Sequence, residues 1–389
     1  MEQKNNETVI EVEEISNWEE LNANPLLLRG IYAYGFEAPS AIQKKAIKPI
    51  FDKRDIIAQA QSGTGKTACF SIGALQLIDM SLTTPQAIIM SPTRELALQS
   101  ASVVKALGSM FPTLRTQILI GGTSLDDDSF SLQNTPSQII IGCPGRIHDM
   151  LKRRRLTTKD LRLLVLDEAD EMLSVGFKDQ VYNIFQFMPS TIQVALFSAT
   201  LPEEIKHITA LFMRNPVRIT VKTELLTLEG IKQYYVALGN DDQKYDTLKD
   251  IYGEVSISQC IIYCNSVKRV ADLYEAMVND NFPVCCIHSG MEKQERTRSY
   301  DDFKAGKFRV LISSNVTARG IDVQQVSTVV NFDVPNCEHT YLHRIGRSGR
   351  WGRKGVAINF VTARDMSILK HMETYYHTQI PELPTQWSV

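Results

Sequence analysis

The chain has 389 residues, more than one compact core usually serves, and a common domain size of about 150 residues suggests two domains. Its hydrophobic fraction of 43% and charged fraction of 22% are ordinary for a globular protein, which excludes disordered, collagen-like and membrane-embedded classes. The formal net charge of −2 means that a nucleic-acid partner must be held by a local basic surface rather than by an overall positive field.

The amino-terminal segment and the cysteines indicate an intracellular protein. Residues 1–14 are polar and acidic and lack a signal-peptide pattern, and no apolar run in the chain approaches the roughly 18 residues of a membrane span. The seven cysteines fall mostly in apolar segments, so we expect packing cysteines rather than a disulfide framework. Cys260 and Cys264 do not have the spacing of a zinc knuckle, and His288 is expected to be structural.

The first strong feature along the chain is a β-rich run at 55–58, followed by a glycine-containing loop and a helix-compatible stretch at 68–80. In this order, loop N–H groups and the helix N-terminus cradle phosphate oxygens, a lysine reaches the terminal phosphates, and a hydroxyl binds Mg²⁺. Ala60 stands where the pattern usually begins with glycine, and an ordinary glycine-rich turn is the alternative interpretation. The predicted nucleotide-binding residues of this loop are Gln61, Ser62, Gly63, Thr64, Gly65, Lys66 and Thr67.

Further apolar runs in the first half predict a parallel sheet covered by helices on both faces. They lie at 87–90, 138–141, 163–166 and 194–197. The run at 163–166 ends in Asp167 and Glu168, at the edge where open α/β sheets carry their ligand chemistry. With Mg²⁺ on the phosphates, Asp167 can hold the ion through water, and Glu168 can orient and deprotonate the attacking water. Acidic clusters alone are usually solvated surface, so the phosphate loop is what makes this pair a catalytic candidate.

The second half repeats the pattern of strands and helices. Its predicted strands lie at 260–263, 284–287, 310–312, 328–332 and 356–360. We predict an α/β protein with a first domain at 1–220, a linker at 221–230 and a second domain at 231–389.

Motifs spread over nearly the whole chain resemble those of the DEAD-box RNA helicases. Besides the phosphate loop, they include Gly35 to Gln43, Asp167 to Asp170 and His343 to Arg350. The resemblance implies two tandem RecA-like domains, ATP as substrate with Mg²⁺, and RNA-stimulated ATP hydrolysis coupled to local unwinding of RNA.

The resemblance also implies contacts to the nucleoside. The Gln43 amide would read the donor and acceptor edge of adenine, and Asp322 would approach the ribose. Trp18 falls where the family usually has a phenylalanine that stacks on the base, and a simple core anchor is the alternative for this ring.

The resemblance also implies a set of residues that contact RNA. They would contact its phosphates and sugars, which predicts binding that does not depend on the RNA sequence. Arginines meet phosphates, glycines allow close approach of a backbone, and a serine hydroxyl can donate. In the first domain these residues are Pro92, Arg94, Gly121, Gly122, Gly145 and Arg146, and in the second they are Arg296 and Ser314.

The remaining motifs are implied to couple ATP to RNA. The hydroxyls of Ser198 and Thr200 would bond the Asp170 carboxylate, although without the family this segment would be only a strand-end turn. In the second domain, His343 would contact the catalytic elements of the first. Arg347 and Arg350 would be arginine fingers that stabilise charge on the transferring phosphoryl group, with a phosphate-binding surface as the alternative.

The chain departs from the family pattern at several positions near the RNA motifs. Cys143 replaces a threonine and offers only a weak S–H donor, Asn315 replaces an aspartate and removes a charge, and Lys293 replaces a glutamine and adds a cation. Ser289-Gly290 replaces Gly-Asp, for which the sequence suggests no physical account. None of these positions belongs to the hydrolytic residues.

Within the family, the resemblance is greatest to helicases of translation initiation, which implies a monomeric cytoplasmic enzyme that acts on single-stranded or short duplex RNA with an initiation scaffold protein. The alternative is an ATP-gated RNA clamp like the exon-junction relative, in the nucleus, because Arg347 to Arg350 resembles both groups.

Overall fold

The structure is a computed structural model that describes residues 13–60, 63–174, 176–221, 230–254, 259–317, 326–348 and 355–384. The chain divides into two compact units, Met1–Lys222 and Thr223–Val389, which we call unit 1 and unit 2. Most of the predicted linker, and the site residues Gln61, Ser62, Asp322 and Arg350, lie outside the described residues.

Unit 1 contains a seven-stranded parallel sheet in the described residues, with the strand order β3-β4-β2-β5-β6-β1-β7. Its strands are β1 (Ile56–Gln59), β2 (Ala87–Met90), β3 (Thr116–Leu119), β4 (Ile139–Gly142), β5 (Leu163–Leu166), β6 (Gln193–Ser198) and β7 (Val217–Thr220). The five runs predicted from the sequence are all strands here. The two edge strands, β3 and β7, are not among these runs. Only one of the four residues of β3 is fully buried, and β7 alternates buried and exposed residues, so neither has a continuous apolar signal.

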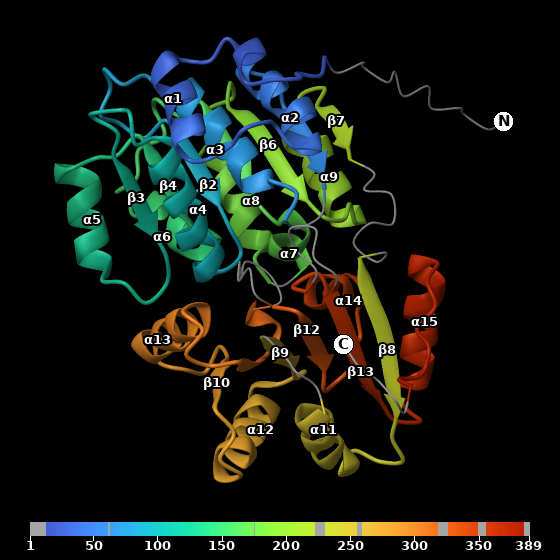
Figure 1. The fold of residues 1–389 in the computed structure, drawn as a ribbon. Coiled ribbons are helices and arrows are strands. Elements are labelled where there is room, and N and C mark those ends of the chain that lie inside the picture. Colours follow the sequence, from blue (N-terminus) through green and yellow to red (C-terminus); the bar gives the residue numbers. More distant parts are fainter. Residues whose placement is uncertain are drawn as a thin grey trace. The chain divides into compact units, whose positions relative to one another are not determined.

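The strands of unit 1 alternate their side chains between two hydrophobic clusters. In β5, Leu163 and Val165 join the cluster that includes helices α1 (Pro25–Ala33) to α4 (Arg94–Leu107), whereas Leu164 and Leu166 join the cluster that includes helices α6 (Pro144–Lys152) to α9 (Glu203–Phe212). Figure 1 shows helices on both sides of this sheet. The helices are α1 (Pro25–Ala33), α2 (Ala41–Phe51), α3 (Lys66–Leu77), α4 (Arg94–Leu107), α5 (Leu125–Asn134), α6 (Pro144–Lys152), α7 (Ala169–Ser174), α8 (Lys178–Gln186) and α9 (Glu203–Phe212), with the 3₁₀ turn η1 at Glu19–Leu21.

Several of these helices begin at residues that cap their free N–H groups. Thr93 accepts a hydrogen bond from the Leu96 N–H at the start of α4, and Ser124 accepts one from the Asp127 N–H at the start of α5. Ser40 and Gln43 form a reciprocal capping box at the start of α2.

Unit 2 contains a six-stranded parallel sheet in the described residues, with the order β10-β11-β9-β12-β13-β8. Its strands are β8 (Ile231–Ala237), β9 (Cys260–Tyr263), β10 (Val284–Ile287), β11 (Val310–Ser313), β12 (Thr328–Asn331) and β13 (Gly355–Val361). Its helices are α11 (Gln243–Glu254), α12 (Val267–Asn279), α13 (Lys293–Lys304), α14 (Glu338–Ile345) and α15 (Met366–Tyr376), with the 3₁₀ turn η2 at Asn315–Thr317. Each strand predicted for this half is present.

The sheet of unit 2 is also covered by helices (Figure 1). Side chains of α11 and α12 pack with one set of strand residues, those of α13 with another, and those of α14 and α15 with β8 and β13. Cys260 and Cys264 are buried and free, as expected for packing cysteines. No helix among the described residues has the length and apolar content that crossing a membrane requires.

Candidate nucleotide and RNA site

The described part of the phosphate loop has a backbone that favours glycine. Gly63 and Gly65 have φ angles of 84° and 99°, which residues with a Cβ rarely adopt. Helix α3 begins at Lys66, so its unpaired N–H groups and positive dipole end lie at the loop. Thr67 lies half-buried on the first turn of this helix. A phosphate group is the ligand that such a loop favours.

Two residues from the start of α2 hold the loop. The Ser40 hydroxyl donates to the Thr64 carbonyl at 2.8 Å, and Gln43 Nε2 donates to the Gly65 carbonyl at 3.2 Å. Gln43 Oε1 accepts from the Ser40 N–H at 2.8 Å. Counting bonds to described residues, the Gln43 amide keeps one N–H and one lone pair, which is the pair of groups that an adenine edge requires.

Trp18 lies in the core rather than on a surface. Its side chain is fully buried, its indole N–H donates to the Phe36 carbonyl at 3.2 Å, and its ring packs against the Phe36 ring at 6.2 Å between centroids. Neither face of this ring is accessible to a base in this arrangement. The burial favours the core-anchor alternative over the base-stacking role that the resemblance implied.

The acidic pair after β5 lies beside the phosphate-loop lysine. Lys66 Nζ is 3.3 Å from Glu168 Oε1, and both side chains are about 5% exposed. Burial, and then the neighbouring Glu168 carboxylate, raise the pKa of Asp167 to about 7, although the Lys66 cation opposes the shift. Glu168 has a positive φ of 49°, so its backbone conformation is strained for a residue with a Cβ. Buried carboxylates of this kind fit a site that binds a further cation.

Ser198 and Thr200, which are predicted to couple ATP to RNA, form different hydrogen bonds with Asp170. The Thr200 hydroxyl donates to Asp170 Oδ2 at 2.8 Å, which confirms the predicted bond to the carboxylate. The Ser198 hydroxyl instead accepts from the Asp170 backbone N–H at 3.2 Å, and the prediction that it donates to the carboxylate was wrong in this respect. Ser198 ends β6, which pairs with β5, so its hydroxyl lies at the first turn of α7 and helps to cap that helix.

The predicted RNA residues of unit 1 lie at the carboxyl ends of three adjacent strands, β2, β3 and β4. Pro92 is buried after β2, and Arg94 Nη1 donates to the Gly121 carbonyl after β3 at 2.6 Å. Gly122 has a φ of 78°. A Cβ built on Gly121 or Gly145 would meet no atom within 4 Å, so the space next to these glycines is open. Backbone groups in such positions can approach a nucleic-acid strand closely.

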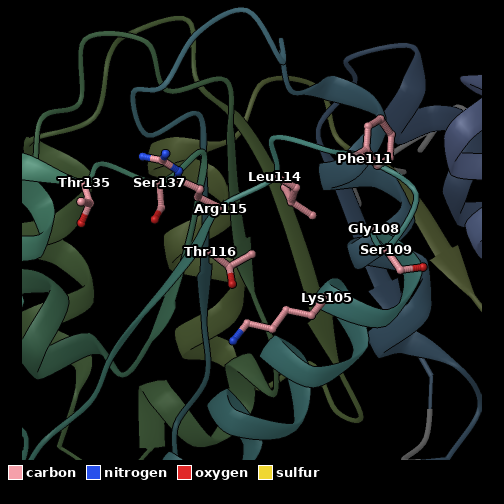
Figure 2. A pocket seen from close by; sticks show the side chains of 9 residues that line it. All are labelled: Lys105, Gly108, Ser109, Phe111, Leu114, Arg115, Thr116, Thr135 and Ser137. Atoms are coloured by element: carbon pink, nitrogen blue, oxygen red, sulfur yellow. The ribbon is translucent and has the colours of Figure 1, made fainter.

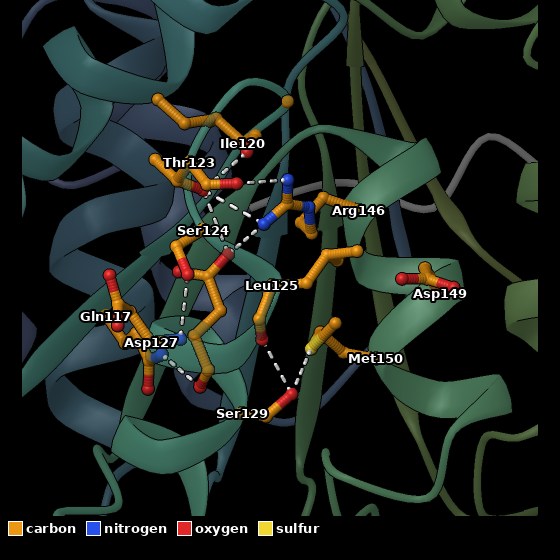
Figure 3. Close-up of polar contacts among 12 residues, drawn as sticks. Gln117, Ile120, Thr123, Ser124, Leu125, Asp127, Ser129, Arg146, Asp149 and Met150 are labelled. Carbon is orange, nitrogen blue, oxygen red and sulfur yellow. Dashed lines mark hydrogen bonds and ion pairs between the residues drawn. The ribbon is translucent and has the colours of Figure 1, made fainter.

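Arg146, which the sequence assigns to RNA phosphates, is engaged inside unit 1. Its Nη1 forms an ion pair with Asp128 and donates to the Thr123 hydroxyl, and its Nη2 donates to the Thr123 carbonyl at 2.9 Å. Figure 3 shows the guanidinium directed at Thr123. The Arg146 and Asp128 side chains are each 10% exposed. Sequence reasoning missed Asp128, because three consecutive aspartates at a helix start look like ordinary N-terminal charges.

The predicted residues of unit 2 lie at the carboxyl edge of its sheet and on two helices. Ser314 follows β11 and is 8% exposed, and Arg296 lies half-buried on α13. His343 is on the last turn of α14, and Arg347 follows that helix with its Nε donating to the His343 carbonyl at 3.1 Å. Arg344, between them, is fully buried and was not predicted as a site residue.

A cavity of about 520 Å³ lies away from all of these residues (Figure 2). It is lined by the end of α4, the start of β3 and the segment before β4, including Lys105, Arg115 and Thr116. This is the amino-terminal edge of the sheet, where helix α4 presents its carboxyl end. The cavity therefore lies at the opposite edge of the sheet from the phosphate loop, which follows the carboxyl end of β1.

Comparison with known proteins identifies the family. The DEAD/DEAH box helicase family matches residues 40–208, and the helicase conserved C-terminal domain matches residues 243–352. A Neurospora crassa protein called ATP-dependent RNA helicase eIF4A is 52% identical over 372 residues, which cover 96% of this chain and 93% of that protein. The chain belongs to the DEAD/DEAH box helicase family. The Schizosaccharomyces pombe protein of the same name is 51% identical and covers 96% of this chain and 94% of its own.

Solved structures of this helicase family share the fold. The chain resembles Saccharomyces cerevisiae Dbp5 bound to RNA and ADP BeF3, with a TM-score of 0.87 and 36% identity over 96% of each chain. It also resembles Mss116p bound to ssRNA and AMP-PNP, with a TM-score of 0.85 and 27% identity over 96% of this chain and 80% of the other. The predicted fold, two RecA-like parallel sheets flanked by helices, is confirmed. The names of the relatives do not favour the exon-junction alternative.

Proposed function

We propose that the chain is an ATP-dependent RNA helicase of the eIF4A type, in which RNA-stimulated ATP hydrolysis drives local unwinding of RNA. The observation that carries this proposal is the cluster of Lys66, Asp167 and Glu168 beside the phosphate loop, where one lysine meets two buried carboxylates. Lys66 binds the terminal phosphates, and Glu168 orients the attacking water and accepts its proton. The relatives named ATP-dependent RNA helicase eIF4A support this assignment.

Mg²⁺ is the cation that this cluster would bind together with ATP. Thr67 would offer its hydroxyl, and Asp167 would hold the ion through water, since hard oxygen ligands suit Mg²⁺. A bound Mg²⁺ supplies positive charge that neutralises the phosphate oxygens. The raised pKa of Asp167 supports this role, because a buried carboxylate next to another carboxylate lacks sufficient positive charge from Lys66 alone.

RNA would lie along the carboxyl ends of β2, β3 and β4. The open space at Gly121 and Gly145 and the bond that joins Arg94 to Gly121 support a surface that follows a sugar-phosphate backbone. In unit 2, Ser314 and Arg296 would contact the same strand. Binding of this kind reads no base edges, so we propose sequence-independent recognition of single-stranded or short duplex RNA.

We further propose that ATP and RNA together bring the two units into one active site. Unit 1 carries the phosphate loop and carboxylates, whereas Arg347 and Arg350 of unit 2 would act as arginine fingers on the transferring phosphoryl group. Thr200 and Ser198 hold Asp170, and His343 would meet these elements on closure. Hydrolysis then weakens the RNA contact and resets the enzyme.

The central test replaces Glu168 with glutamine, which keeps the shape of the side chain and removes the base. We expect Glu168→Gln to lose RNA-stimulated ATP hydrolysis and to retain ATP-dependent RNA binding in a fluorescence anisotropy titration. Glu204→Gln, at an exposed position of α9, is the matched control and keeps both activities. Full turnover by Glu168→Gln would contradict the mechanism.

The cellular role follows from the eIF4A-type assignment. We propose a monomeric cytoplasmic enzyme that binds an initiation scaffold protein. Affinity purification of the tagged chain tests this role, because initiation proteins should copurify. Recovery of nuclear splicing-associated proteins would instead favour the exon-junction type of function.

A further inference from the structure

Arg344 of α14 is a fully buried cation in unit 2, and each of its five N–H groups makes a hydrogen bond. The acceptors lie at or just after the carboxyl ends of three adjacent strands, β9, β11 and β12, so a single side chain joins these strand ends to the helix. The bonds run from Nε to Asn315 Oδ1 at 2.9 Å, from Nη2 to Asn315 Oδ1 at 2.6 Å and Asn265 Oδ1 at 2.7 Å, and from Nη1 to Asn331 Oδ1 at 3.2 Å and the Asp333 carbonyl at 2.8 Å.

None of the acceptors that surround Arg344 among the described residues is a carboxylate. The Asp333 carboxylate is nearby, but Lys244 Nζ and the Arg269 guanidinium bind it at 3.0 and 2.8 Å. The Asn265 N–H also donates to it. Burial lowers the pKa of the Arg344 guanidinium to about 10, so the group is still charged at neutral pH. In the part of the chain that the structure describes, the guanidinium is therefore held by hydrogen bonds to neutral oxygens, and the loss of one acceptor would leave a buried N–H group without a partner.

Asn315 accepts two of the five bonds through one oxygen atom, at a position where the residue as a whole is exposed and these bonds are partly buried. It is the first residue of η2 and directly follows Ser314, the predicted RNA contact. On the other side of the contact, Arg344 is three residues before Arg347, whose Nε is bonded to the carbonyl of His343. The Asn315–Arg344 contact thus joins the segment that would bind RNA to the helix end that carries the arginine finger.

We propose that Asn315 is a positioning residue that couples RNA binding at Ser314 to the placement of Arg347. The proposal rests on the functions proposed above for Ser314 and Arg347. A displacement of the backbone at Ser314 moves the amide oxygen that accepts two of the five hydrogen bonds of Arg344, and through these two bonds it shifts the side chain and α14, which carries it. The coupling acts within unit 2 and requires no further ligand.

The test compares RNA-free and RNA-stimulated ATP hydrolysis of the full chain. We expect Asn315→Ala to lower kcat at saturating RNA at least about tenfold, because the substitution removes the acceptor of two charge-assisted hydrogen bonds. Hydrolysis without RNA, KM for ATP and the RNA concentration for half-maximal stimulation should change little, because the atoms that bind these ligands remain. Asn279→Ala, at the exposed end of α12, is the matched control and leaves all four quantities unchanged.

Two further variants separate positioning from a loss of folding. Asn315→Asp keeps an oxygen at the same place and adds a counter-charge, so it retains the RNA stimulation of the wild type and raises the thermal unfolding temperature. Asn315→Leu fills similar volume without an acceptor and behaves like Asn315→Ala. A structural role alone would lower hydrolysis with and without RNA in parallel with the unfolding temperature.

The outcomes distinguish this inference from the proposed function. If the wild-type chain shows no RNA stimulation, the proposed function and the coupling both fail. If the wild-type chain is stimulated and Asn315→Ala is stimulated equally, the coupling alone is overturned. A parallel loss of RNA-free and RNA-stimulated hydrolysis in Asn315→Ala, or a loss of RNA stimulation in Asn315→Asp, would also overturn it.

Discussion

Gly65 of the phosphate loop offers a test in which local strain and lost contacts can be separated. It has a φ of 99°, and a Cβ at this position would lie 2.7 Å from Gln43 Nε2 and 2.9 Å from Ser40 Oγ. Gly35 has a similar φ of 93°, but a Cβ there would meet nothing within 4 Å. Substitution by alanine therefore strains the backbone at both positions, but only at Gly65 does the new Cβ collide with other side chains.

The expected loss of stability follows from these contacts. A Cβ at positive φ costs about 1–2 kcal/mol, which is partly offset by about 0.4–1 kcal/mol because alanine restricts the unfolded chain. Gly35→Ala should therefore lower the free energy of unfolding by about 1 kcal/mol. Gly65→Ala should also break the bonds from Ser40 to Thr64 and from Gln43 to Gly65, each worth about 0.5–1.5 kcal/mol, for a total of about 3 kcal/mol.

Nucleotide binding should separate the two variants more sharply than stability does. Displacement of the loop moves the N–H groups that would bind phosphate, so Gly65→Ala should weaken binding of a fluorescent ADP analogue at least about tenfold. Gly35→Ala should bind it as the wild type does. Urea unfolding followed by circular dichroism measures the stabilities. Equal effects of the two substitutions on nucleotide affinity would refute the assignment of Ser40 and Gln43 as supports of the loop.

Two further predictions concern the catalytic edge of unit 1. The pKa of Asp167 is raised from 3.8 to about 7 in the folded chain, so the folded state binds more protons than the unfolded state between these values. In metal-free buffer, this carboxyl group should therefore favour folding below about pH 4 and lose that contribution as pH rises to about 7. Asp167→Asn should remove this part of the pH dependence of the free energy of unfolding, which urea unfolding at several pH values measures. The same pH dependence in the variant and the wild type would contradict the raised pKa. Separately, Thr200→Val removes the hydroxyl that donates to Asp170, and we expect fewer RNA duplexes separated per ATP hydrolysed. Thr209→Val, which removes a hydroxyl bonded to the Lys206 carbonyl, is the matched control, and an equal loss in both variants would exclude a specific role for Thr200.

Much of the fold could be predicted because its signals are local. Strands covered on both faces appear as short apolar runs, and the segment from 55 to 80 shows strand, loop and helix in order. The edge strand β3 was missed because its side chains are mostly half-buried, so its sequence does not form a continuous apolar run.

The site residues could be predicted from the sequence only where they directly follow a recognisable strand or loop. Lys66 follows its strand and loop, and Asp167 and Glu168 follow theirs, so their presence at one sheet edge could be inferred from parallel pairing. The contact of Thr200 with Asp170 was also foreseen, since their strands are neighbours, but the direction of the Ser198 bond was not.

The sequence by itself thus determined which chemical groups stand at the ends of the strands, because period and spacing are local properties of the chain. Only the tertiary structure decided which of these groups meet one another. It buried Trp18 in the core, paired Arg146 with Asp128, and surrounded Arg344 with amide oxygens from the ends of three strands. Such contacts join residues far apart in the chain, and their geometry depends on packing that no short pattern encodes.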